Sequence, residues 1–195
     1  MSGHSKWSQI RHKKAITDAK KGNLFSKMVR EITIAAKTGS SAIAGKPTTA
    51  GDPNPDMNIQ LKAAIERAKA VGLPKNNIDR AIAKAGGQGE GADLFEFLYE
   101  ASAPGGVAIL IEGITDNKNR TLNEIKHLLS KHEARLADPG SLLWAFEKIW
   151  TANSGHTYKP RSPLTPPEMP LSLKTLLNAI SEHDDVQEVY TNIND

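Results

Sequence analysis

GGQGEGADLFEFLYEASAPGGVAILIEGI, residues 86–114, is the stretch that decides the fold of this 195-residue chain. It opens on a cluster of glycines and continues into two runs, 94–100 and 107–114, that are rich in β-branched and aromatic residues and predict β-strands. The residues between the runs, Pro104 to Gly106, are typical of a turn. Upstream, apolar residues recur at three- and four-residue spacings, which indicates helices. The change of period predicts a Gly-rich linker at 86–92.

The residues before the linker predict a small bundle of helices. Three segments carry apolar side chains on one face, and Asn23 is a candidate cap for the first of them. An earlier helix over 6–20 is also predicted, although few of its residues are apolar. The stretch 38–56 is rich in Gly, Ser, Thr and Pro and predicts a surface loop. We therefore expect a basic helical domain over 1–85. The three amphipathic segments lie around residues 25–36, 61–68 and 75–85.

The residues after the linker predict an α+β domain over 93–195. Its order of elements is typical of a ferredoxin-like lobe, provided that a further strand lies between residues 149 and 162. Five prolines in the stretch 159–170 predict an extended, Pro-rich connection instead. Beyond the first two strands, the predicted elements are a helix from about Asn119, a strand at 141–148, a helix at 171–181 and a strand at 186–192.

Electric charge divides at the same linker. Residues 1–85 carry 16 Lys and Arg against 6 Asp and Glu, a net charge of +10, whereas residues 86–195 carry 9 against 16, a net charge of −7. Clustered basic side chains favour binding to a phosphate backbone, because each contact releases condensed counterions. The asymmetry therefore predicts that the N-terminal part, the head, binds nucleic acid and that the remainder has a different role.

The first 37 residues hold the strongest candidate site, with nine basic residues against two acidic ones. If the earliest helix forms, lysines recur every seven residues along it and make a basic ridge suited to phosphates. Trp7 has two interpretations, stacking on a base or anchoring the helix in the core, and both remain open. The predicted nucleic-acid-binding residues are Lys6, Trp7, Arg11, Lys13, Lys14, Lys20, Lys21, Lys27 and Arg30.

A second candidate is the polar loop that follows the second strand. Its side chains either contact a partner or serve as the caps and hydrogen bonds of a turn, and both interpretations are kept. The loop contains Asp116, Asn117, Lys118, Asn119 and Arg120.

Catalytic, metal and cofactor sites are not predicted. The chain has no cysteine, so thiolate chemistry is excluded. His127 and His132 diverge on a helix, and the stretch 183–185 is interpreted as a turn between a helix and a strand. The AGKPT motif at 44–48 lacks the first glycine and the hydroxyl residue of a phosphate-binding loop. We therefore expect no enzymatic activity, no cofactor, no metal and no small-molecule substrate.

Membrane association is not expected either. The longest apolar run, 107–111, is far shorter than the ~20 residues of a spanning helix. The first residues carry charges but no apolar core of a secretory signal. Together with the lack of cysteine, these features predict a cytoplasmic protein.

Several stretches resemble the YebC/PmpR family of bacteria and its mitochondrial translational-activator relatives. They include GHSKW at 3–7, LPKNNIDRAI at 73–82, PGGVAILIEGITDNKNRT at 104–121 and EHDDVQEVYTN at 182–192. The resemblance implies a helical N-terminal domain followed by two α+β lobes. It also implies a non-enzymatic regulator, either a DNA-binding transcriptional regulator or a translation factor that binds rRNA or tRNA on the ribosome and relieves stalling.

The chain departs from that family at one place. Only residues 149–170 separate the strand at 141–148 from the last predicted helix, where the family has a whole further lobe. We therefore expect a natural reduction that keeps the head and the middle lobe and lacks the third. Oligomeric state and target sequence are left open.

Overall fold

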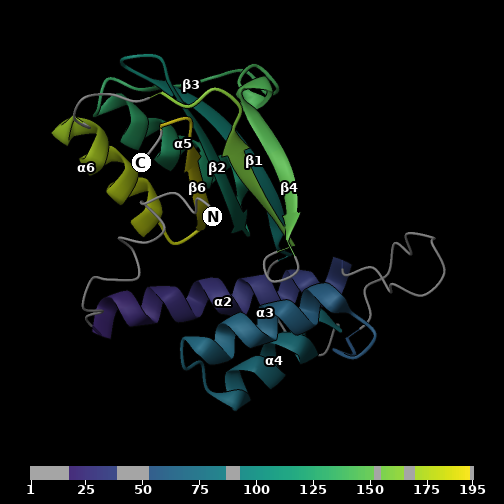
Figure 1. Cartoon of the computed structure of the whole chain (residues 1–195). Helices are drawn as coiled ribbons and strands as arrows, with labels where there is room; N and C mark the ends of the chain where they lie inside the picture. Colours follow the sequence, from purple (N-terminus) through teal and green to yellow (C-terminus); the bar gives the residue numbers. More distant parts are fainter. Residues whose placement is uncertain (1–17, 39–52, 87–92, 152–154, 165–169, 194–195) are drawn as a thin grey trace.

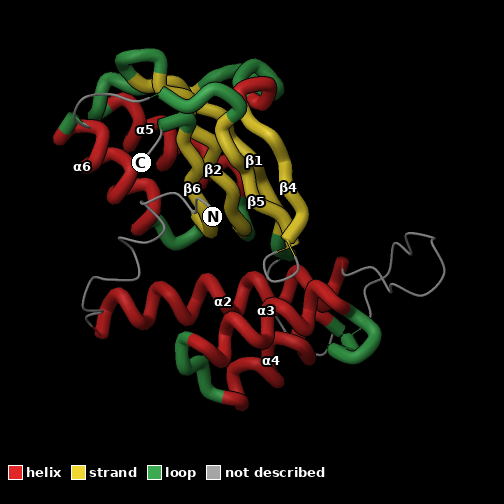
Figure 2. Tube along the Cα trace, viewed as in Figure 1, coloured by secondary structure: helices red, strands yellow, loops and turns green. Residues whose placement is uncertain are grey.

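The computed structural model describes residues 18–38, 53–86, 93–151, 155–164 and 170–193. They form a layer of helices and, above it, an α+β domain (Figure 1). Figure 2 shows that helices make up all of the lower part, while the strands are confined to the upper part. None of the described helices is both long and apolar enough to cross a membrane.

The helical layer consists of α2 (Asp18–Thr38), α3 (Ile59–Ala70) and α4 (Lys75–Ala85). The buried Asn58 caps the start of α3, because its Oδ1 accepts the Leu61 N–H (2.9 Å). Its Nδ2 donates to the Ala35 carbonyl (2.8 Å) and so also ties this helix start to α2. The three predicted amphipathic segments are thus confirmed as helices with a common core. That core is centred on Ile32, Leu61, Ala64, Ala68, Ile78 and Ala81.

An antiparallel sheet with strand order β3-β1-β2-β6 forms the centre of the α+β domain. β1 (Phe95–Ala103) and β2 (Val107–Thr115) make a hairpin whose turn glycines, Gly105 and Gly106, have φ of +79° and +77°. β3 (Arg135–Leu136) pairs with β1, and β6 (Val186–Thr191) pairs with β2.

The two helices of this domain, α5 (Lys118–Ser130) and α6 (Leu171–Glu182), cover one face of the sheet (Figure 1). Apolar side chains of both helices recur at helical spacing because they face the core between the helices and the sheet. This core includes Ile109, Ile111, Ile125, Leu129, Leu176, Leu177 and Ile180.

A two-stranded ribbon packs on the other face of the sheet. It consists of β4 (Phe146–Thr151) and β5 (Gly155–Pro160), preceded by the short 3-10 helix η1 (Leu143–Ala145). Phe146 of the first strand and Leu110 of β2 belong to a second, small core, against which the half-buried Tyr158 packs. We call β4 and β5 together the ribbon.

The α+β class is confirmed, but the strand predicted at 141–148 is wrong. Residues 143–145 form η1, and the strand begins only at Phe146 and pairs with β5 outside the main sheet. The strand that pairs with β1 in the main sheet, on the side away from β2, is instead β3. The cause is the Glu100 carboxylate, which accepts the backbone N–H groups of Gly140, Leu142 and Leu143 and so holds this stretch in a turn. The predicted connection at 159–170 still carries the end of β5, up to Pro160.

The division into domains at residues 86–92 remains our proposal, and limited proteolysis tests it. Trypsin should cut at Lys46 and a Glu-specific protease at Glu90 before either cuts inside α2, α3 or α4, because helix cleavage requires local unfolding. Mass spectrometry of the first fragments identifies the sites. Early cleavage within the helices, with both of these sites intact, would contradict the division.

Candidate nucleic-acid interface and domain junction

The predicted basic ridge lies largely outside the described residues. Five of its nine members, Lys6, Trp7, Arg11, Lys13 and Lys14, precede the first described residue. Lys20 and Lys21 belong to α2, and Lys21 is exposed. The last two members, Lys27 and Arg30, lie in a different environment, at the contact between α2 and the α+β domain. We call this contact the junction.

Asn23 does not cap a helix. α2 begins at Asp18 and passes through this position without a break. The Asn23 Nδ2 instead donates to the Glu182 carbonyl (2.8 Å) and to Asp184 Oδ1 (2.7 Å). The predicted cap is therefore wrong, because the turn after α6 supplies acceptors that a sequence read locally does not reveal.

Lys27 and Arg30 are occupied at the junction. The side chain of Lys27 is only 4% exposed, and its Nζ donates to the Ser181 carbonyl (2.7 Å). Arg30 Nη1 donates to the Asp184 carbonyl (2.5 Å) and lies 2.8 Å from Asp185 Oδ1. The structure therefore gives both residues contacts within the protein. Their role in binding nucleic acid stays a prediction.

Asp185 is the centre of the junction, with a side chain that is 2% exposed. Arg30 approaches its Oδ1 from the helical layer, and Arg120 Nη2 donates to its Oδ2 (2.7 Å) from α5. The hydroxyls of Thr115 and Thr121 donate to the same Oδ2 at 3.1 and 2.6 Å. One buried carboxylate thus holds together α2, β2 and α5.

These contacts determine the charge state of Asp185. Burial favours its neutral acid, but hydrogen bonds from Thr121 and Arg120, the positive charge of Arg30 and a hydrogen bond from Thr115 together outweigh burial. They hold the pKa of Asp185 below the ordinary value of a carboxyl group. The pKa of Arg120 is raised in turn, chiefly by its hydrogen bond to Asp185. Asp185 is therefore an anion at neutral pH.

A pH dependence of stability follows from the lowered pKa of Asp185. The stabilisation is complete above the unfolded carboxyl value near 3.8 and is lost as the pH falls through the lower folded value. Urea unfolding at a series of pH values from 5 to 2 should show a steeper loss in the wild type than in Asp185→Asn, which has no carboxylate to protonate. Parallel curves for the two proteins would contradict this assignment.

The predicted polar loop at 116–120 makes internal contacts that suit the turn interpretation. Asn117 caps α5 through its Oδ1, which accepts the Arg120 N–H (3.1 Å). Arg120 Nη2 also lies 2.9 Å from Asp116 Oδ1, and the ammonium group of Lys118 lies over the Phe95 ring. Since Arg120 and Arg30 share the Asp185 carboxylate, the loop and α2 meet at the junction. A role for the loop, including the exposed Asn119, in binding a partner stays a prediction.

Glu124, His183 and Asp185 offer potential metal-ligand atoms within 4.8 Å of one another. His183 ends α6, as the predicted turn requires, and its Nε2 lies 3.0 Å from Glu124 Oε2 while its Nδ1 accepts the Asp185 N–H (3.1 Å). The guanidinium groups of Arg30 and Arg120 already neutralise Asp185. The arrangement therefore favours an ion-pair network over a cation site.

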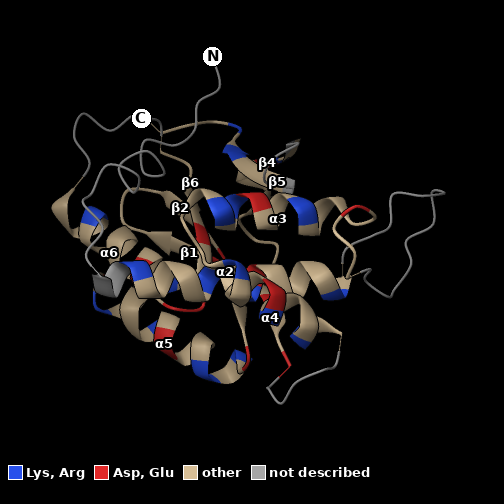
Figure 3. Ribbon diagram, turned by 90° about the horizontal axis from the view of Figure 1, so that it is seen from below, with Lys and Arg blue, Asp and Glu red and all other residues tan. Residues whose placement is uncertain are grey.

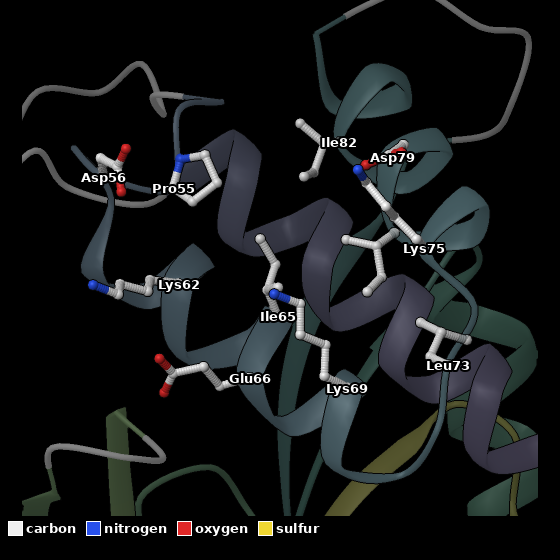
Figure 4. A pocket seen from close by; sticks show the side chains of 11 residues that line it. Pro55, Asp56, Lys62, Ile65, Glu66, Lys69, Leu73, Lys75, Asp79 and Ile82 are labelled. Atoms are coloured by element: carbon white, nitrogen blue, oxygen red, sulfur yellow. The ribbon is translucent and has the colours of Figure 1, made fainter.

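The surface of α3 and α4 carries charges of both signs (Figure 3). A shallow groove of about 540 Å³ separates the two helices, with Ile65 and Ile82 among its apolar lining. Figure 4 shows Glu66 between Lys62 and Lys69 along one side of it. Interleaved charges of both signs make the groove a poor site for a phosphate backbone.

The fold and the junction together show a layer of helices that is ion-paired to an α+β unit. The family model described as "TACO1/YebC protein N-terminal domain" matches residues 5–88, and that described as "TACO1/YebC second and third domain" matches residues 94–152. This chain belongs to the TACO1/YebC family.

Curated relatives are named probable transcriptional regulatory proteins. One from Brachyspira hyodysenteriae is 49% identical over 148 residues, which cover 76% of this chain and 56% of the relative. One from Desulfosudis oleivorans is 41% identical over 196 residues, which cover 100% of this chain and 73% of the relative. The chain spans about half the length of the first curated relatives it matches, between 54% and 56%.

A solved structure extends the likeness to the whole fold. The crystal structure of a conserved hypothetical protein from Aquifex aeolicus has a TM-score of 0.82 and 32% sequence identity to this chain. The match covers 97% of each chain. The path of the chain through both the helical layer and the α+β domain is therefore similar to that of an experimentally determined protein.

Proposed function

We propose that this protein is a non-enzymatic, nucleic-acid-binding regulator of gene expression, of the DNA-binding transcriptional kind. The observation that carries the proposal is the segregation of charge, +10 before the linker and −7 after it. Phosphate backbones are attracted to the first part and repelled by the second, so nucleic acid binds on the helical side. The names of the relatives support regulation of transcription.

The ion pairs of the junction support a non-enzymatic role. Among the described residues, the cluster of polar groups around Asp185 is engaged in contacts that hold the two parts together. The hydroxyls in it, those of Thr115 and Thr121, are fully buried against the Asp185 carboxylate and are closed to a substrate. We place the regulator in the cytoplasm, with nucleic acid as its partner and without a membrane, cofactor or small-molecule substrate.

The alternative is an RNA-binding translation factor that acts on the ribosome. It uses the same basic region, because phosphate contacts position a protein without distinguishing DNA from RNA. Equilibrium binding of the full chain to a DNA duplex and to an RNA duplex of equal length, each at several salt concentrations, tests both. The proposal requires tighter binding to DNA and a steep salt dependence, whereas tighter binding to RNA selects the alternative. Failure to bind either at 50 mM salt overturns both.

A further inference from the structure

Four ring side chains form a row across the ribbon and the neighbouring β6. Trp150, His156, Tyr158 and Tyr190 follow one another edge to face, with centroid separations of 5.7, 5.6 and 5.2 Å. The register of the ribbon explains the spacing, because Trp150 pairs with His156 across its two strands. The row ends on Trp150, whose surface is 69% exposed.

Glu112 of β2 holds two rings of this row, His156 and Tyr190. Its Oε1 lies 2.8 Å from His156 Nε2, and its Oε2 accepts the hydroxyl hydrogen of Tyr190 (3.2 Å). Rings that are held in place before binding lose little conformational entropy when a ligand stacks on them. The exposed indole is therefore supported on a rigid base.

A cation stands beside the exposed indole. Lys148 Nζ lies 5.4 Å from the centroid of Trp150 and 5.6 Å from that of Tyr158. Residues 139–161 carry three basic side chains and a single acidic one, in a domain where acidic residues are otherwise in excess. The basic residues are Lys148, Lys159 and Arg161.

A rigidly supported, exposed aromatic ring next to an ammonium group offers one contact for the base and one for the phosphate of a single nucleotide. The ring stacks on a base of any identity, and the ammonium group meets the phosphate. An apolar protein partner would instead require further apolar side chains around Trp150. Among the described residues, its neighbours on the same face of the ribbon are Lys148 and His156, with Tyr158 beyond them. The surface therefore favours nucleic acid over protein.

We propose that the ribbon is a binding site for single-stranded nucleic acid, with Trp150 as the base-stacking platform and Lys148 as the phosphate contact. The inference rests on the proposed function and extends it to a second surface, on the α+β domain. β4 runs toward the helical layer, and Trp150 is the fifth of its six residues (Figure 1). The end of β4 that carries Trp150 is thus the end nearest the helical layer.

Tryptophan fluorescence tests the stacking directly. The full chain with Trp7→Phe and Trp144→Phe retains Trp150 as its sole tryptophan. We expect its emission to be quenched on titration with either of two 12-nucleotide probes, oligo-rU and oligo-dT. Relative quenching by the two probes distinguishes an RNA from a DNA source, and quenching by either supports the site. Unchanged emission at saturating probe would overturn it.

Affinity for the same probes provides the second measurement. Trp150→Ala should weaken binding by about fivefold or more, and Trp150→Tyr should retain most of it, since base stacking contributes ~1–3 kcal/mol. Lys148→Ala should reduce the log-log salt slope by ~0.7. Phe95→Ala is the matched control: Phe95 is 45% exposed and has the ammonium group of Lys118 5.4 Å from its centroid, but among the described residues it belongs to no row of contacting rings, unlike Trp150. This control should bind like the wild type.

The outcomes separate this site from the proposed function. If Trp150→Ala and Phe95→Ala both bind the probes like the wild type, the ribbon site is wrong. If the wild type binds duplexes but neither single-stranded probe, the ribbon site is wrong and the proposed function stands. If it binds neither duplexes nor single strands, both are wrong. Thermal unfolding of each variant confirms that a loss of binding is not a loss of fold.

Discussion

Substituting Lys13, Lys14, Lys20 and Lys21 by Gln should weaken duplex binding at least about tenfold at low salt and flatten the salt dependence. Each phosphate contact that is lost should lower the log-log slope by up to ~0.9. The loss should be similar for all duplex sequences, because phosphate contacts position the protein without reading bases. Fluorescence anisotropy at 50–300 mM salt measures both quantities.

A matched variant separates the location of the charges from their number. Lys62, Lys69, Lys75 and Arg80 are exposed on α3 and α4, and their replacement by Gln removes the same four charges. This control should change binding far less, since acidic residues are interleaved with these positions. Equal losses in the two variants would show that net charge alone matters and would remove the N-terminal ridge from the binding site.

Asp185→Ala should be the most destabilising single substitution at the junction. It removes the acceptor of Thr115 and Thr121 and leaves two guanidinium groups facing one another across the vacated position. Breaking a buried ion pair from one side costs ~3–5 kcal/mol, and because Arg120 is 43% exposed we expect about 3 kcal/mol here. Chemical unfolding followed by circular dichroism measures the loss.

The neighbouring residue is the control for this substitution. Asp184 is exposed, and its carboxylate accepts a single side-chain hydrogen bond, from Asn23 (2.7 Å). Asp184→Ala should therefore lower the free energy of unfolding by less than about 1 kcal/mol. Similar losses in the two variants would show that Asp185 is not the centre of the junction.

The spacing of apolar residues correctly predicts the helices that have one strongly apolar face. Leu61, Ala64 and Ala68 lie on one face of α3 and are all buried, as their spacing requires. The strand at 141–148 is misplaced because the two-residue spacing of Trp144 and Phe146 suggests that both side chains are buried on one face, whereas only one of them is. Trp144 is 72% exposed while Phe146 is buried. The deciding partner, Glu100, is distant in sequence and lies on β1.

The candidate site was only partly predictable for the same reason. Local charge marks Lys27 and Arg30 as members of a basic ridge, but their acceptors lie 154 residues away, in the last turn of α6 and in the turn that follows it. The available signal was complementarity between a basic helix and the acidic run at 182–185. The stacking row was equally hidden, because its rings come from strands whose register the sequence does not specify.

The pairing of β6 with β2 has a consequence for how the chain folds during synthesis. Asn192 accepts the Ala108 N–H through its Oδ1 (2.8 Å) across 84 positions, so the sheet cannot close until β6 has been made. The core of the helical layer is complete by Ala81. At ~5–20 residues per second, the intervening stretch of about 110 residues takes roughly 5 to 20 s to translate. During that interval the helical layer can fold on the nascent chain with its full positive charge, and it docks through Asp185 only afterwards.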